Sequence, residues 1–266
     1  SIQLGSGNLS SRELNKLQRM MDVTRASLLF AKGIILVEGL SESIVIPILA
    51  KRSAVLLAEK AISVVPVCGV DFSTIASLFG KEGLRIPVAI VTDADPLVEE
   101  IAGSGPSWKR EKPKTDSSGK TTVGSRVTKL VKDIADNPYV KVFHSEVTIE
   151  YDLALAGPKN PTIMCSAWEA CFDSVPETLN NSVLKECNGN HEDESLVVWR
   201  GICRASPSRG KAEYAQSLAH VLGEMDEAGA FKIPVTDFVV PPYLQAAWSH
   251  VGGDAKPSPK STSAHS

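Results

Sequence analysis

Residues 33–42 read Gly33-Ile34-Ile35-Leu36-Val37-Glu38-Gly39-Leu40-Ser41-Glu42. Residues 33–37 form an apolar run with branched side chains, which is typical of a buried β-strand. Glu38 ends the run, Gly39 allows a turn, and Glu42 lies at the start of a segment with a helical pattern. A carboxylate at the end of a buried strand needs a partner or a bound cation, because an unpaired buried charge is strongly disfavoured. The stretch predicts a strand–turn–helix unit with a polar site at the turn.

A second apolar run, residues 85–91, is followed by Asp93 and Asp95. Side chains two residues apart in an extended chain point the same way, so these two carboxylates are expected to lie close together. They repel each other unless a cation lies between them. Mg²⁺ and Mn²⁺ suit such oxygen ligands and also accept a phosphate. The structural alternative is that Asp95 starts a turn before Pro96 and that Asp93 caps a helix.

The pattern from residue 33 onwards alternates between strands and helices. Further strands are expected at 61–67 and 139–143, and helices at 42–59, 72–83 and 123–136. Short apolar strands separated by helices predict an α/β fold with a mainly parallel sheet of about four strands and helices on both faces. Functional groups gather at the carboxyl ends of such strands. We therefore expect Glu38 and Asp93 at one edge of the sheet.

The chain divides into four parts by sequence pattern. We expect a helical lead-in at 1–32, an α/β catalytic domain at 33–157, a helical subdomain at 158–251 and a disordered tail at 252–266. No apolar run approaches the ~20 residues of a membrane span, and no signal peptide is recognisable. The five cysteines form no CxxC pair. These features predict a cytoplasmic protein with reduced thiols.

A basic segment is hidden within the overall net charge of −3. Residues 108–132 hold eight basic side chains against two acidic ones, a net charge of +6. The Gly-, Ser-, Pro- and Lys-containing part at 103–122 predicts a mobile loop. Such a segment either follows a DNA backbone or is a solvated loop. The candidate DNA-binding residues are Lys109, Arg110, Lys112, Lys114, Lys120 and Arg126.

A glutamate motif after one strand and Asp-Ala-Asp after another resemble the Toprim domain of topoisomerases, DnaG-type primases and related nucleases. Residues 30–39, Val91-Thr92-Asp93-Ala94-Asp95 and Thr148-Ile149-Glu150-Tyr151-Asp152-Leu153 resemble more specifically the C-terminal nuclease region of the OLD (overcoming lysogenisation defect) family of ATP-dependent endonucleases. The resemblance implies a Rossmann-like Toprim fold and a metal-dependent DNA endonuclease. It also implies an ABC-type ATPase region upstream in a longer protein, and a possible homodimer through that region. This chain contains no GxxxxGK[ST] loop.

The same resemblance assigns the site residues. Two divalent metal ions, Mg²⁺ or Mn²⁺, would be held by Glu38, Glu42, Asp93, Asp95 and Glu150. A lysine would face the scissile phosphate, and Lys211 is assigned because Gly210-Lys211-Ala212-Glu213-Tyr214-Ala215 matches the family's Lys-Gly-x-Phe-Ala pattern, with Ala212 and Tyr214 as departures. Asp152 is a candidate supporting partner.

Structural alternatives exist for three of these side chains. Glu42 and Glu150 are also first-turn acids that favour a helix N-terminus, and Lys211 is alternatively a solvated residue at a helix start.

Other functions make different demands on the residues. A topoisomerase needs a nucleophilic tyrosine in a separate cleavage domain, and a primase is expected to carry a zinc module; neither is found in this sequence. An aspartate-nucleophile phosphatase would use Asp93 and leave Glu38 without a role. A receiver-like domain phosphorylated on Asp93 and a non-catalytic DNA-binding module are the non-enzymatic alternatives.

Overall fold

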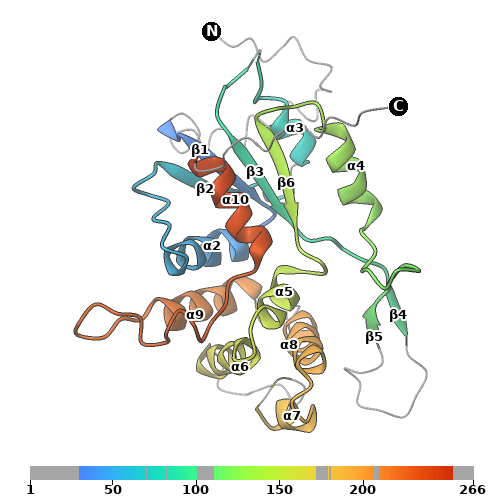
Figure 1. The fold of residues 1–266 in the computed structure, drawn as a ribbon, viewed down its shortest axis with the longest axis vertical. Coiled ribbons are helices and arrows are strands. Elements are labelled where there is room, and N and C mark those ends of the chain that lie inside the picture. The colour runs from blue at the N-terminus through green and yellow to red at the C-terminus, as the bar shows by residue number, and fades with distance from the viewer. Residues whose placement is uncertain are drawn as a thin grey trace, which may run out of the picture.

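The computed structural model describes residues 30–69, 71–81, 83–100, 111–171, 179, 181–205 and 210–253. Almost all of the expected lead-in helix, the tail beyond 253, and the candidate DNA-binding residues Lys109 and Arg110 lie outside these ranges. The centre of the described part is a parallel sheet with helices on both of its faces (Figure 1). The expected α/β fold class is therefore confirmed.

The sheet consists of β1 (Gly33–Val37), β2 (Ile62–Pro66), β3 (Val88–Thr92) and β6 (Val140–His144). Their order is β2-β1-β3-β6, and all neighbouring pairs are parallel. The chain moves outward from β1 to β2 and then returns to the other side of β1 to form β3. This reversal creates a switch point between β1 and β3, where such sheets place their functional crevice. Glu38 and Asp93 directly follow these two strands.

Strand β1 is buried on both faces, which explains its uninterrupted apolar sequence. Ile34 and Leu36 pack in one core with α3 (Phe72–Ala76) and α4 (Ser125–Asp133). Ile35 and Val37 belong to a larger core on the other face. That core includes side chains of α2 (Leu40–Arg52) and α10 (Pro242–Gly252). Alternate residues of one strand thus hold two helical layers together.

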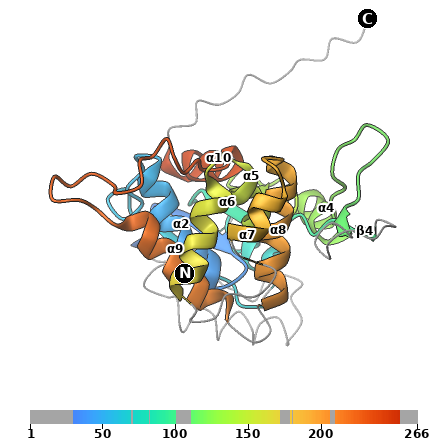
Figure 2. The ribbon, with the colours of Figure 1, turned by 90° about the horizontal axis from the view of Figure 1, so that it is seen from below.

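The remaining helices complete the larger core. They are α5 (Ile149–Leu155), α6 (Asn160–Cys171), α7 (Asn181–Glu186), α8 (His191–Ala205) and α9 (Lys211–Gly223). Helix α9 packs against α2 and α6, and α5 packs against α8. Figure 1 shows α6 to α9 grouped at the lower end of the molecule, the end that faces the viewer in Figure 2. Trp168, Leu218 and Trp248 share the core with β1, so the helices after residue 158 help to cover the sheet. No helix in the described ranges has the length and apolar character required to cross a membrane.

Three expected helices are shorter than the sequence pattern predicted, and one of them is α4, which covers Ser125–Asp133 of the expected 123–136. Helix α2 ends at Arg52 because Ala54 adopts a left-handed backbone (φ 59°) and Val55 donates its N–H to the Ala50 carbonyl. Helix α3 ends at Ala76, although a helix to residue 83 was expected. The chain there turns back, and Leu84 donates its N–H to the Leu78 carbonyl. The spacing of apolar residues predicted longer helices in both places, because it does not indicate the turns at which α2 and α3 end.

The described part of the loop expected at 103–122, residues 111–122, contains a strand and a tight turn, which corrects the expectation for this part. Strand β4 (Val98–Glu100) pairs in antiparallel fashion with β5 (Glu111–Pro113). Beyond β5, the Asp116 carboxylate accepts hydrogen bonds from the backbone N–H groups of Ser118 and Lys120 and closes a tight turn. These elements project from the body beside α4 (Figures 1 and 2). The β4–β5 pair and the turn at Asp116 are held by local backbone hydrogen bonds, which a pattern of hydrophobic residues does not predict.

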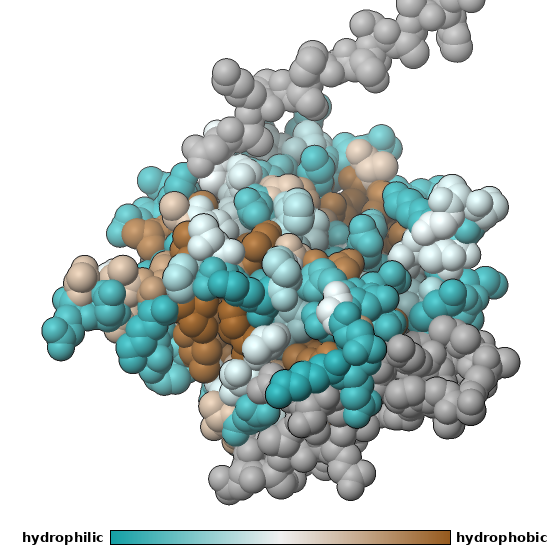
Figure 3. Space-filling view, turned by 60° about the horizontal axis from the view of Figure 1, so that its bottom comes forward, coloured by the Kyte–Doolittle hydropathy of each residue, from teal (hydrophilic) through white to brown (hydrophobic). Residues whose placement is uncertain are grey.

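Hydrophobic and hydrophilic side chains are unevenly distributed over the molecular surface. In the face shown in Figure 3, hydrophobic side chains gather near the middle and hydrophilic ones dominate the outer contour. Leu97 is exposed over 67% of its surface, whereas Leu36 of β1 has no exposed surface. Leu36 and Leu97 are therefore a buried and an exposed leucine whose substitutions are directly comparable.

We expect Leu36→Ala to lower the free energy of unfolding by about 2–5 kcal/mol, because it leaves a cavity between β1 and its covering helices. Urea unfolding followed by circular dichroism measures this change. Leu97→Ala is the matched control and should change the free energy by less than about 0.5 kcal/mol. Equal effects of the two substitutions would contradict the assigned core.

Candidate metal centre

Four carboxylates meet at the switch point of the sheet. Glu38 follows β1 and Asp93 follows β3, while Glu42 lies in the first turn of α2 and Glu150 in the first turn of α5. Burial raises the pKa of Asp93 well above its ordinary value, and the charges of Glu150, Glu38 and Glu42 raise it further. The structure thus brings together four of the five acids that the sequence assigned to one site.

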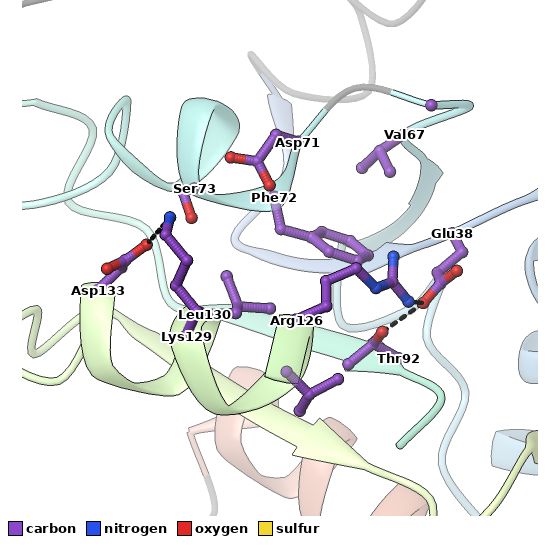
Figure 4. Close-up of a pocket in the computed structure, with 12 residues that line it drawn as sticks. Glu38, Val67, Asp71, Phe72, Ser73, Thr92, Arg126, Lys129, Leu130 and Asp133 are labelled. Atoms are coloured by element: carbon purple, nitrogen blue, oxygen red, sulfur yellow. Dashed lines mark hydrogen bonds and ion pairs between the residues drawn. The ribbon is translucent and has the colours of Figure 1, made fainter. Parts of the chain in front are cut away.

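Glu38 is held by two neighbours. Thr92, the last residue of β3, donates its hydroxyl to Oε1 of Glu38. Nη2 of Arg126 donates to the same oxygen at 2.6 Å and to Oδ2 of Asp95 at 2.9 Å. Figure 4 shows Arg126 reaching from α4 to Glu38, while Thr92 contacts the same carboxylate. The acid at the end of β1 is therefore neutralised by a cation from a distant part of the chain.

Glu42 caps the start of α2. Its Oε2 accepts a hydrogen bond from the Gly39 N–H at 3.0 Å, which satisfies one free donor of the helix N-terminus. Burial raises the pKa of Glu42 and the Glu150 charge adds to this, while backbone hydrogen bonds lower it in part. The capping contact proposed as the structural alternative is present, and the second carboxylate oxygen is not used in it.

Asp93 connects β3 to α5. Its Oδ1 accepts a hydrogen bond from the Ile149 N–H at 2.9 Å. Helix α5 begins here because the Thr148 side chain caps it and accepts from the Tyr151 N–H. The next residue after Ile149 is Glu150, so the contact to Asp93 places a second acid beside the first.

Glu150 is almost fully buried and uses only one of its carboxylate oxygens. Oε1 lies 3.2 Å from Nζ of Lys211. Among the residues that the structure describes, buried Oε2 has no hydrogen-bond partner. A buried carboxylate oxygen without a partner is costly. This atom is accordingly suited to bind a further donor or cation.

Lys211 reaches the site from the first turn of α9. Helix α9 packs against α2, and Lys211 lines a small cavity of about 20 Å³ together with Glu42 and Glu150. Burial has the largest single effect and lowers the pKa of Lys211, but the Glu150 charge, the smaller contributions of Cys203 and Asp93 and the hydrogen bond to Glu150 together outweigh it. The net pKa is therefore above the ordinary value. The side chain is therefore an ammonium ion at neutral pH.

Asp95 has a different environment. It is exposed, has a left-handed backbone (φ 45°), and contacts the site through the shared Arg126. Of the other candidate DNA-binding residues, Lys112 pairs with Glu99 at 3.4 Å, and Lys114 and Lys120 are exposed. Arg126 was expected to contact a DNA backbone; in the structure its guanidinium contacts Glu38 and Asp95, and a contact with DNA stays a prediction.

Two residues hold the turn between β6 and α5, and the sequence indicated only one of them. The hydroxyl of buried Ser145 accepts a hydrogen bond from the Ala94 N–H at 3.1 Å. Asp152 accepts from the N–H groups of Glu146 and Val147, and burial raises the pKa of Asp152 to about 7. Asp152, the candidate supporting partner, thus holds the segment that leads into α5, whereas a lone serine offers no sequence signal for its contact.

The residues fit a divalent metal ion by their chemistry. Oxygen ligands from carboxylates suit Mg²⁺ or Mn²⁺, and the unpaired Oε2 of Glu150 lies within the cluster. In the described part of the chain, however, no three Asp, Glu, His or Cys side chains are arranged closely enough to hold an ion as they stand. The reason is visible in their contacts: Glu38, Glu42 and Asp93 each direct an oxygen at a protein donor.

Comparisons with known proteins agree with this geometry. Residues 29–95 match the family profile described as overcoming lysogenization defect protein-like, TOPRIM domain. The fold is similar to the C-terminal region of the Burkholderia pseudomallei OLD protein, with 25% identity, a TM-score of 0.55, and coverage of 85% of this chain and 98% of that chain. A second similar structure is the C-terminal region of the Xanthomonas campestris pv. campestris OLD protein, with 22% identity, a TM-score of 0.54, and coverage of 86% and 95%. The sequence has no match among curated proteins.

The matched residues 29–95 contain Glu38, Glu42, Asp93 and Asp95, four of the five acids that the resemblance assigned to the site, and Glu150 lies outside the match. Sequence motif, sheet topology and similarity to solved structures thus point to one family. Residues 29–95 form an OLD-like Toprim domain, within a chain whose fold matches the C-terminal regions of OLD proteins over most of its length.

Proposed function

We propose that this chain is the nuclease part of an OLD-type protein and cleaves phosphodiester bonds of DNA with two divalent metal ions, Mg²⁺ or Mn²⁺. The observation that carries the proposal is the convergence of Glu38, Glu42, Asp93 and Glu150 with Lys211 at the switch point of the sheet. An ABC-type ATPase region is expected upstream in the full protein, with a possible homodimer formed through it. All five cysteines are free thiols, which suits action in the cytoplasm.

Each residue has a distinct part in this proposal. Glu38, Glu42, Asp93, Asp95 and Glu150 supply the oxygen ligands. Two cations held by these oxygens would supply activation of a water molecule and charge stabilisation for the leaving oxygen. Lys211, oriented by Glu150, offers an ammonium group to the negative charge that develops on the phosphate. Exposed Lys114 and Lys120 contribute a basic surface for the DNA backbone.

The aspartate-nucleophile phosphatase fits the contacts less well. Asp93 is buried, its Oδ1 is engaged by the Ile149 N–H, and three acids surround it. These charges repel a phosphate monoester in the absence of cations. A catalytically silent DNA-binding module remains the competing non-enzymatic function, and it predicts DNA binding without cleavage.

Asp93→Asn is expected to reduce metal-dependent cleavage of supercoiled plasmid by about 100-fold or more, because the site loses the carboxylate that the other acids surround. Nicked and linear products are quantified on gels with Mg²⁺ or Mn²⁺. Glu59→Gln is the control, since Glu59 is exposed at the opposite edge of the sheet. Hydrolysis of small phosphomonoesters without DNA cleavage would favour the phosphatase.

Lys211→Ala is expected to reduce the single-turnover cleavage rate by about 100-fold, the scale on which removal of one transition-state donor acts. Metal binding should persist, because the substitution removes a cation from Glu150 and leaves all the carboxylates. Isothermal titration with Mn²⁺ and plasmid cleavage separate the two effects. Lys185→Ala, at the exposed end of α7, serves as the control. Unchanged cleavage in Lys211→Ala would assign the role to another cation.

The stability gained from metal should increase with pH. The pKa of Asp93 is raised by folding, so its proton stabilises the fold at low pH, and this contribution is lost as pH rises through the folded value. Asp152 has a pKa of about 7, so its proton also stabilises the fold at low pH, and this contribution is likewise lost as pH rises. A divalent cation bound at the site would compete with the proton for the Asp93 carboxylate. We therefore expect Mn²⁺ to raise Tm more at about pH 8 than at about pH 5.

Thermal unfolding with and without Mn²⁺ at the two pH values checks this expectation. Asp93→Asn should remove most of the metal-induced rise at the higher pH. An equal rise in Tm at both pH values would mean that metal and proton do not compete at Asp93.

A further inference from the structure

Arg126 occupies two of the oxygens assigned to metal. Its Nη2 donates to Oε1 of Glu38 at 2.6 Å and to Oδ2 of Asp95 at 2.9 Å. Its side chain is 55% exposed, so water reaches the contact. The guanidinium therefore neutralises these acids with bonds that it is able to exchange for others, in contrast to Lys211, whose partner Glu150 is almost fully buried.

The position of Arg126 is built by the backbone of α4. The Gly124 N–H, immediately before the helix, donates to the Ala94 carbonyl at 2.8 Å. A Cβ atom at Gly124 would lie 2.6 Å from the Asp95 carbonyl oxygen, so only glycine permits this close approach. The start of α4 is thereby joined to the end of β3, and Arg126, the second residue of the helix, is directed at the acids.

The side chain of Arg126 also borders a cavity. A cavity of about 160 Å³ lies between α3 and α4, and Glu38, Phe72, Arg126 and Lys129 contribute to its lining (Figure 4). The hydrogen bonds of Arg126 to described residues all use Nη2. Nε and Nη1 are left as donors at the border between the acids and this cavity. Guanidinium groups bind phosphate through several donors at once.

We propose that Arg126 is a transferable counter-ion, which competes with a divalent cation for Glu38 and Asp95 and binds a phosphodiester of the DNA when the cation takes these carboxylates. The inference rests on the proposed function for the identity of its substrate. The competition between Arg126 and the cation concerns metal affinity alone, so it is testable whether or not the chain cleaves DNA. The arginine keeps the acids neutralised without metal and couples metal binding to substrate binding.

The first experiment measures Mn²⁺ affinity by isothermal titration without DNA. Arg126→Gln should bind Mn²⁺ roughly 2- to 10-fold more tightly than the wild-type chain, because the competing charge is gone. Arg126→Lys keeps the charge and should lie between the two. Lys129→Gln is the matched control: it removes the same charge one turn along α4, from a pair with Asp133, and should leave the Mn²⁺ affinity within about 2-fold.

Equal or weaker Mn²⁺ binding by Arg126→Gln would overturn the competition, as would the absence of Mn²⁺ binding in both chains. Circular dichroism establishes that the variants are folded. Because Arg126 is half exposed, the substitution is expected to leave the fold intact. Tighter Mn²⁺ binding together with an absence of cleavage would uphold the competition and reject the proposed nuclease function.

The second experiment measures the binding of a short DNA duplex with and without Ca²⁺, chosen as a cation that supports binding with little cleavage. Arg126→Gln should weaken DNA binding by about 5-fold or more with Ca²⁺, and by less than about 2-fold without it. Lys129→Gln should cause the same small loss in both conditions. A loss in Arg126→Gln that is equal with and without Ca²⁺ would overturn the transfer to phosphate.

Discussion

Repulsion among carboxylates at the ends of β1 and β3 is the constraint on which the rest of the site depends. Parallel strands that are neighbours at a switch point bring the residues after them to one crevice, and here those residues are Glu38 and Asp93. Each acid is compensated by a donor from another element. Thr92 and Arg126 contact Glu38, and the N–H at the start of α5 contacts Asp93. The positions of α4 and α5 therefore depend on their contacts with these carboxylates as well as on packing in the core.

Two cations approach this crevice from opposite faces of the sheet. Arg126 comes from α4, which packs with α3 on one face, and Lys211 comes from α9, which packs with α2 on the other. Their environments differ. Lys211 is paired with an almost fully buried carboxylate, whereas Arg126 is half exposed and borders a cavity. Such an arrangement suits a lysine that stays in place and an arginine that changes partners.

The helices after residue 158 contribute to the site through packing. Trp168 and Trp248 lie in the same core as Ile35 and Val37, and the contact between α9 and α2 carries Lys211 to Glu150 and Glu42. A substitution in this core therefore acts on the position of Lys211 as well as on stability. The division of the chain at residue 157 stays a prediction about its organisation, while the packing joins both parts around one sheet.

The amino-acid sequence by itself determined the parallel sheet and the acids at its edge. Strands buried on both faces appear as apolar runs, and a carboxylate directly after such a run is visible without knowledge of its partners. The ends of α2 and α3 and the β4–β5 pair were not predicted, because left-handed residues, glycine turns and local strand pairing leave the apolar spacing unchanged.

Only the tertiary structure decided which charges meet. Arg126 lies 88 residues from Glu38 in the chain, and in sequence it is one basic residue among several. Its contact depends on the close approach of Gly124 to the end of β3. Likewise, the unpaired Oε2 of Glu150 follows from the burial of α5 against its neighbours. Local patterns report which residues are buried, whereas the partner of a charged group is set by how distant elements pack.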